Sequence, residues 1–202
     1  MDQFHKKKEN KTEKKHTAQQ NFVLDLHDLV YLLALVLVIY LLFFRVVVVV
    51  GDSMFDTLVD GDRVVIISNL LYNEPKAGDV IVASKDSFRN GECIVKRVIA
   101  TEGQEVNIDF ETGTVYVDGV ALEEDYTTTK ATNFEGVTFP LVVKEGCLFV
   151  MGDNRIVSKD SRSPEIGFID ERQVMGKALF LLIPGTDSGT VTADFGRIGV
   201  IK

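Results

Sequence analysis

An apolar run near the start of the chain limits most strongly what this sequence can fold into. Residues 24–44, LDLHDLVYLLALVLVIYLLFF, contain no Gly, Pro or Lys, and their few polar residues lie near the start. As a helix, this run would extend about 31 Å, which matches the hydrocarbon core of a bilayer. The alternatives are a buried core helix and a cleaved signal peptide, but the run is too long for a signal peptide and lacks an A-x-A-like cleavage site. We therefore expect one transmembrane helix at residues 24–45.

Charge is distributed unevenly on the two sides of this run. Residues 1–16 carry six Lys against three acidic residues, whereas only Arg45 follows the run directly. Because positively charged flanks stay in the cytoplasm, residues 1–23 are predicted to be a basic cytoplasmic tail and residues 46–202 an extracytoplasmic domain. From residue 46 onward, 25 Asp and Glu outnumber 15 Lys and Arg, which does not favour nucleic-acid binding.

The extracytoplasmic part has the pattern of β-strands. Runs rich in β-branched and apolar residues, bounded by Gly, Pro, Asn and Asp, occur at 63–68, 79–84, 92–100, 105–109, 114–119, 147–152 and 177–183. The turns between them suit hairpins, so we expect a mainly β fold with an antiparallel, barrel-like domain. The more polar residues 123–139 are predicted to form a long loop.

Few kinds of catalytic chemistry remain open to such a domain. His5, His16 and His27 all lie before or at the start of the apolar run, so a Ser-His-Asp triad outside the membrane is excluded. Cys93 and Cys147 without an external His make a zinc site improbable, and two thiols in the core are favoured over a disulfide. The sequence predicts no metal and no cofactor.

A Ser nucleophile can instead use a neutral Lys as its base. Ser53 lies in GDSMFDTL directly after the apolar chain, and Lys96 lies within the apolar strand CIVKRVI. Burial would favour the neutral form of this Lys by lowering its pKa. Alternation sends Lys96 and Arg97 to opposite faces, so one of them needs a buried partner, unless the strand is one-sided and that cation faces solvent. Residues 152–162, GDNRIVSKDSR, offer such partners, although this segment could also be a solvated loop.

Three segments resemble, in order, the motifs of bacterial type I signal peptidases: GDSMFDTLVDGDRV, GECIVKRVIATEGQEV and MGDNRIVSKDSR. With the preceding apolar run, the resemblance covers about residues 25–183. It implies a membrane-bound serine endopeptidase whose catalytic domain, residues 46–202, cleaves signal peptides from secreted preproteins after small residues. The implied partners are signal peptides and membrane lipid, with no nucleic acid.

The resemblance also implies roles for individual residues. Ser53 would be the nucleophile and Lys96 the general base. Ser158 would orient the Lys96 amine, and Arg97 would lie beside the base. Independently of the resemblance, a cation next to Lys96 is expected to lower its pKa slightly. The supporting network would comprise Arg97, Asp153, Asp160 and Arg162.

Two positions depart from the family pattern. Asp56 stands where the family usually has Pro, which puts the rigidity of the turn after Ser53 in question. Gly51 stands where some relatives have a hydroxyl residue as an oxyanion donor. The backbone N–H of Ser53 is then expected to supply more of that stabilisation.

We expect the substrate to add as a strand beside residues 46–50, with small side chains entering shallow apolar pockets. The residues expected to line these pockets are Val49, Val50, Met54, Leu58, Ile94 and Val95, and ordinary core packing is the alternative for each. Two other functions stay open. One is a catalytically degenerate membrane-anchored binding module, and the other is a different, self-processing Ser/Lys peptidase.

Overall fold

The computed structural model describes residues 2–85, 92–186 and 193–201, and for residues 2–20 it describes the backbone alone. The chain divides into two units, Met1–Leu42 and Phe43–Lys202.

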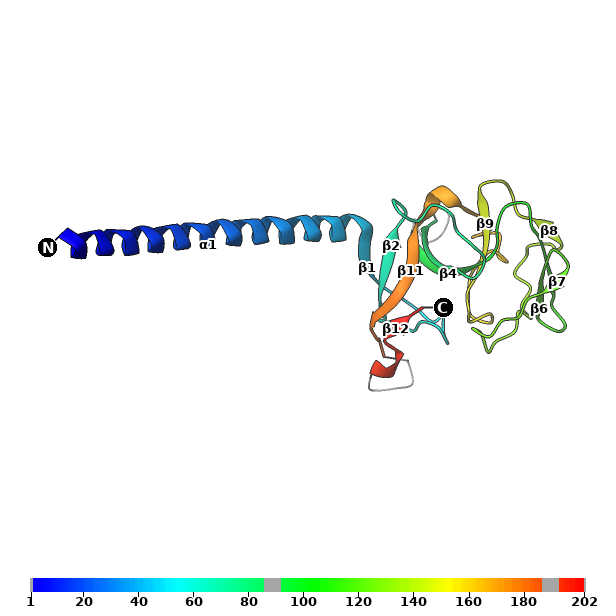
Figure 1. Cartoon of the computed structure of the whole chain (residues 1–202). Helices are drawn as coiled ribbons and strands as arrows, with labels where there is room; N and C mark the ends of the chain where they lie inside the picture. The colour runs from blue at the N-terminus through cyan, green and yellow to red at the C-terminus, as the bar shows by residue number, and fades with distance from the viewer. Residues whose placement is uncertain (1, 86–91, 187–192, 202) are drawn as a thin grey trace. The chain divides into compact units, whose positions relative to one another are not determined.

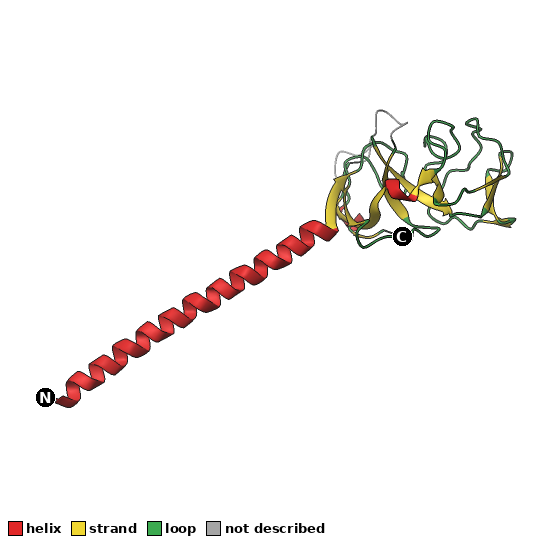
Figure 2. Ribbon diagram, turned by 90° about the horizontal axis from the view of Figure 1, so that it is seen from above, coloured by secondary structure: helices red, strands yellow, loops and turns green. Residues whose placement is uncertain are grey.

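The first unit is a single long helix, α1, Asp2–Phe43, drawn in red in Figure 2. Within it, Asn21–Phe43 is long and apolar enough to cross a membrane, and none of that segment is buried. Exposed Leu, Val and Ile side chains over this length are not expected of the core helix of a soluble protein. The helix begins well before the predicted residue 24, because the preceding polar segment contains no Gly or Pro and is rich in Lys, Glu and Gln, which favour helix.

The second unit is built almost entirely from strands (Figure 1). Two short 3-10 helices, Glu171–Gln173 and Phe195–Arg197, are its only helical elements among the described residues. The strands are β1 Phe44–Val48, β2 Arg63–Ser68, β3 Val80–Ser84, β4 Cys93–Ala100, β5 Glu105–Asp109, β6 Thr114–Val117, β7 Val120–Ala121, β8 Leu141–Val142, β9 Cys147–Met151, β10 Ile169–Asp170, β11 Val174–Ile183 and β12 Gly199–Val200.

These strands form two antiparallel sheets. The larger has the order β1-β2-β11-β3-β4-β9-β10, with β12 beside β11, and the smaller has the order β7-β6-β5-β8. Figure 1 shows β1, β2 and β11 at one end of this unit and β6, β7 and β8 at the other. Neither strand order closes on itself within the described residues, so the mainly β, antiparallel fold is confirmed and the barrel-like shape is not.

Two clusters of core residues hold the segments that carry the predicted site. In the first, Met54 and Leu58 pack with apolar residues of β2, β3 and β11, and both side chains are almost fully buried. In the second, Ile94 and Val98 of β4 pack with Leu148 and Val150 of β9. Ile169 of β10 belongs to the same cluster. The chain after Ser53 and the strand that carries Lys96 are therefore each fixed by apolar packing.

The structure corrects the expectation for one cysteine. Both Cys93 and Cys147 are free thiols, but Cys93 is exposed at the start of β4, whereas a core position was expected. The alternation along the strand sends Ile94 inward and leaves Cys93 facing outward.

Candidate active site

The segment that carries Ser53 is a compact turn following β1. Gly51, at φ +85°, donates its backbone N–H to Asp60 Oδ1 at 2.7 Å. Further on, the N–H of Leu58 donates to the carbonyl of Met54 at 2.7 Å. Because Met54 and Leu58 are also buried, the turn is anchored directly after Ser53, which itself remains half-buried.

Lys96 and Ser53 are in direct contact. The Nζ atom of Lys96 lies 2.7 Å from Ser53 Oγ and donates to the carbonyl of Val95 at 2.9 Å. Only 4% of Lys96 is exposed. The pairing of β3 with β4 places Ile81 opposite Lys96, so the amine is held by a strand with paired neighbours rather than by a loop.

Burial lowers the pKa of Lys96 from 10.5 to about 8. The carboxylates of Asp160 and Asp153 oppose this change, and the guanidinium of Arg162 adds to it. The cation that assists is thus Arg162, whereas the sequence pointed to Arg97. An amine with this pKa is neutral in roughly one molecule in ten at pH 7, and the neutral form is the one able to accept a proton.

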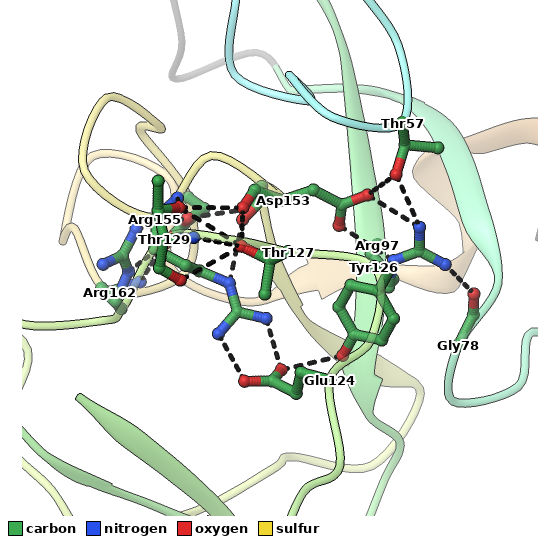
Figure 3. A network of polar contacts seen from close by, with 12 residues as sticks. Thr57, Gly78, Arg97, Glu124, Tyr126, Thr127, Thr129, Asp153, Arg155 and Arg162 are labelled. Atoms are coloured by element: carbon green, nitrogen blue, oxygen red, sulfur yellow. Dashed lines mark hydrogen bonds and ion pairs between the residues drawn. The ribbon is translucent and has the colours of Figure 1, made fainter. Parts of the chain in front are cut away.

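Arg97 lies on the other face of β4 and is fully engaged there (Figure 3). Its Nε and Nη2 atoms donate to the two carboxylate oxygens of Asp153 at 2.9 and 2.7 Å. Nη1 donates to the carbonyl of Gly78 at 2.8 Å, and the guanidinium stacks 4.0 Å from the ring centroid of Tyr126. Both partners of this ion pair are buried, with 1% and 0% of the side chains exposed.

Residues 152–162 form a second set of buried ion pairs behind Ser53. Arg162 donates through Nε and Nη2 to the carboxylate of Asp160, each at 2.9 Å, and Asp160 also accepts the backbone N–H of Gly152 at 3.0 Å. Arg155 forms a bidentate pair with Glu124, seen in Figure 3. This segment is therefore a buried network and not a solvated loop.

The same segment touches the turn that carries Ser53. The backbone N–H of Asn154 donates to the carbonyl of Ser53, and its side-chain amide donates to the carbonyl of Asp52, both at 3.1 Å. A Cβ atom on Gly152 would come within 2.3 Å of the Ser53 carbonyl oxygen and of Ser158 Oγ. Only Gly allows this close approach.

Ser158 does not make the hydrogen bond to Lys96 that the family resemblance implies. Its Oγ is buried, and no residue that the structure describes forms a hydrogen bond with it. Ser158 is nevertheless close to the site, because its Oγ lies beside Gly152, which in turn lies against Ser53.

A cavity of about 350 Å³ opens on the Ser53 and Lys96 side. Of the residues expected to line it, Val49, Val50, Ile94 and Val95 do so. The structure does not bring Met54 and Leu58 to its wall, because the turn after Ser53 directs both into the core, where 1% and 0% of their surfaces are exposed.

Sequence reasoning missed other residues of the cavity wall. They are Val47, Val48, Val82, Glu92, Cys93, Val157, Lys159 and Met175. Val157 had a usable signal, since it is an apolar residue in an otherwise polar motif. Val82 and Met175 had none, because their positions depend on how β3, β4 and β11 pair.

The structure also shows how the chain accommodates Asp56. Its φ is +86°, which the ring of Pro cannot adopt. Its carboxylate accepts hydrogen bonds from the backbone N–H and the hydroxyl of Thr128, at 3.0 and 2.6 Å. The turn is therefore braced by side-chain contacts instead of by a proline ring.

The arrangement combines a hydroxyl, a buried amine of lowered pKa and an apolar cavity. Such a group of atoms suits nucleophilic attack by Ser53 with Lys96 as the proton acceptor.

Comparison with known proteins agrees with this chemistry. The family model described as "Signal peptidase, peptidase S26" matches residues 23–183. The chain is 36% identical over 168 residues to a probable signal peptidase I-1 from Synechocystis sp., covering 78% of this chain and 82% of that protein. It is 32% identical over 182 residues to a signal peptidase I from Bacillus licheniformis, covering 86% and 95% respectively.

A crystal structure of a signal peptidase I from Enterococcus faecalis V583 is also similar. It has 35% sequence identity, covers 52% of this chain and 96% of its own, and has a TM-score of 0.42, which is too low to add to the description of the fold. The family model and the curated relatives together show that this chain belongs to the signal peptidase family, peptidase S26.

Proposed function

We propose that this chain is a membrane-bound signal peptidase I, a serine endopeptidase that removes signal peptides from secreted preproteins with a Ser53/Lys96 dyad. The observation that carries the proposal is the 2.7 Å contact between Ser53 Oγ and a Lys96 amine whose pKa burial lowers to about 8. Membership of the family and the names of the relatives support the substrate class.

The first step is attack by Ser53 on the scissile carbonyl. Neutral Lys96 accepts the hydroxyl proton as the Ser53 Oγ–carbon bond forms, and it then gives that proton to the leaving amine as the peptide bond breaks. A water molecule then attacks the acyl-enzyme while Lys96 accepts one of its protons, and Lys96 gives that proton to Ser53 Oγ as the ester bond breaks. The supporting roles fall to Arg97, Asp153, Asp160 and Arg162, which keep β4 and the Ser53 turn together.

The negative charge that develops on the carbonyl oxygen needs a hydrogen-bond donor. Gly51 has no side chain, and its N–H is already used by Asp60. The backbone N–H of Ser53 is the donor we assign to this role.

The cavity suits a small side chain better than a large one. Val49, Val50, Ile94 and Val95 give it an apolar wall, and its volume is about 350 Å³. The neighbouring strand β1 is at the edge of its sheet, so an extended peptide can pair with it as an added strand. We assign this cavity to the small residues that precede the cleavage site.

The helix α1 is the membrane anchor in this proposal. Six Lys in residues 1–16 against one Arg after the apolar run keep the N-terminus in the cytoplasm and the catalytic domain outside. In intact cells, added protease is expected to digest the domain after residue 46 and to spare residues 1–20. Protection of the domain would contradict this orientation.

The direct test of function is cleavage of a preprotein by the purified full-length chain in detergent. The wild-type chain is expected to release the signal peptide after a small residue, and Ser53→Ala is expected to release none. Replacing the small residues one and three positions before the cleavage site by Phe should stop processing. The proposal would be contradicted if the wild-type chain did not cleave the preprotein, or if Ser53→Ala cleaved it equally well.

A further inference from the structure

Asp56 has a backbone conformation that calls for an explanation. It lies three residues after Ser53 with φ at +86°, and only one other residue besides Gly, Asp118, has positive φ in the described chain. A side chain in this region is strained, so surrounding contacts must hold it there. The holding contacts are the two hydrogen bonds from Thr128 to the Asp56 carboxylate.

Thr128 belongs to a run of three threonines, Thr127–Thr129, which we term the threonine segment. The hydroxyls of Thr127 and Thr129 both donate to the backbone carbonyl of Asp153, the latter at 3.2 Å. The Thr129 hydroxyl also accepts the backbone N–H of Arg155 at 2.7 Å. The threonine segment is thus attached to Asp153 and Arg155 on one side, as Figure 3 shows for Thr127 and Thr129. On the other side it is attached to Asp56.

These contacts close a ring around the nucleophile. The Ser53 carbonyl accepts the N–H of Asn154, Asp153 is joined to the threonine segment, and Thr128 is joined to Asp56, which returns to Ser53 through the chain. Thr57 Oγ1 adds a second link by donating to Asp153 Oδ2 at 2.5 Å. On this side of the turn, the contact between Asp56 and Thr128 acts together with the Thr57 link and the buried side chains of Met54 and Leu58.

We propose that Asp56 and Thr128 are positioning residues, whose contact holds the Ser53 turn in register with Lys96 for proton transfer. The inference rests on the proposed function and extends it to residues that touch neither substrate nor the reacting atoms. Neither side chain lines the cavity beside Ser53, so their loss should lower kcat more than it changes KM.

Asp56→Gly separates positioning from backbone strain. Gly adopts φ +86° without strain, so this variant removes the carboxylate while it relieves the backbone. If the Asp56 carboxylate matters only for folding, Asp56→Gly should change the melting temperature and keep its kcat. Under the proposal it keeps its melting temperature and loses about fivefold in kcat, because both hydrogen bonds from Thr128 that hold the turn are lost.

Three further variants complete the test. Thr128→Val removes the hydroxyl donor and keeps the backbone N–H donor, so it should lower kcat by a smaller factor than Asp56→Gly. Asp56→Asn keeps an oxygen acceptor for Thr128 and should stay within about twofold of wild type. Thr132→Val, the matched control, makes the same change on the same loop at an exposed side chain that makes no hydrogen bond in the described structure, and should match wild type.

The deciding experiment measures kcat, KM and melting temperature for the full-length wild type, Asp56→Gly, Thr128→Val and the double variant on one preprotein. Because Asp56→Gly already removes both hydrogen bonds from Thr128, the double variant should lose no more kcat than Asp56→Gly alone. Wild-type kcat in both single variants, or losses that multiply in the double variant, would overturn the positioning role while leaving the proposed function intact. No cleavage by the wild type would overturn both.

Discussion

Lys96 and Arg97 are neighbours on β4 and are both buried, but their charged groups have different surroundings on the two faces of the strand. On the network face, Arg97 meets the carboxylate of Asp153, a backbone carbonyl and an aromatic ring. On the cavity face, Lys96 meets a hydroxyl and a carbonyl, and no carboxylate pairs with it among the described residues. One buried cation is thus fully paired, and the other is desolvated without an ion-pair partner.

This difference assigns structure to one face and chemistry to the other. A buried guanidinium with a bidentate carboxylate keeps its charge and fixes the strand and the motif at 152–162. A buried amine without a carboxylate partner destabilises the folded chain while the amine is charged. Its pKa therefore falls to about 8, and the neutral amine can act as a base. Adjacent cations on a strand can therefore serve opposite purposes.

The largest effect on stability is expected from breaking the buried ion pair between Arg97 and Asp153. Asp153→Ala leaves the Arg97 guanidinium buried without its carboxylate, which should cost about 3–5 kcal/mol of folding free energy. Thermal unfolding of the full-length chain in detergent measures it. The control is Arg172→Ala, which removes an ion pair of the same bidentate geometry at a side chain that is 89% exposed, and it should change the melting temperature little. Equal losses in the two variants would remove the contrast between buried and exposed pairs.

A smaller effect on stability, which depends on pH, is expected from Lys96. Since the Lys96 pKa is 10.5 when unfolded and about 8 when folded, the unfolded chain holds a proton between these values that the folded chain has lost. The stability contributed by Lys96 therefore rises as pH rises from 8 to 10.5, and the full penalty applies below pH 8.

Comparison with Lys96→Met isolates this contribution. Relative to the variant, the wild-type chain should gain up to about 3 kcal/mol of stability between pH 8 and 10.5. Melting temperatures of both chains at pH 7, 8, 9 and 10 measure the gain. A constant difference between the two chains across this range would mean that the folded Lys96 has an ordinary pKa.

The smallest effect is expected at Ser158. Its hydroxyl is buried beside Gly152 and forms no hydrogen bond in the described structure, so its removal breaks no contact that fixes Lys96. Ser158→Ala should keep its melting temperature and stay within about fivefold of the wild-type cleavage rate. Loss of the rate by two orders of magnitude would show that Ser158 bonds to the amine during the reaction.

The sequence predicted the regular part of the fold because that part has a local pattern. Residues 63–68 and 105–109 were predicted as strands with the bounds that the structure has, because the first is a run of β-branched residues and the second alternates between polar and apolar residues. The two-residue strands β7, β8, β10 and β12 were missed because a pair of residues has no period. The strand β1 was expected only as an extended edge, because the apolar run continues into it without a break.

The candidate site was predictable as far as chemistry restricts it. Because all three His lie before or at the start of the apolar run, Lys96 was the candidate base for Ser53. The charge density of residues 152–162 indicated partners for a buried cation. The contacts of Asp56, Glu124 and Tyr126 could not be predicted, because they depend on where the long loop at 123–139 folds back. Met54 and Leu58 were wrongly assigned to the cavity because they are close to Ser53 in sequence. Such proximity does not tell which way a turn directs its side chains.

The pH dependence of cleavage tests the central claim, that Lys96 is a base whose pKa burial lowers to about 8. For the wild-type chain, kcat/KM on a preprotein should rise about tenfold per pH unit below pH 8 and level off above it, because only the neutral amine accepts the Ser53 proton. Lys96→Arg, whose guanidinium stays charged throughout, should show no such rise and almost no cleavage at any pH. A wild-type profile that is flat from pH 6 to 10, or cleavage by Lys96→Arg at a rate comparable to wild type at pH 8 to 9, would contradict the account.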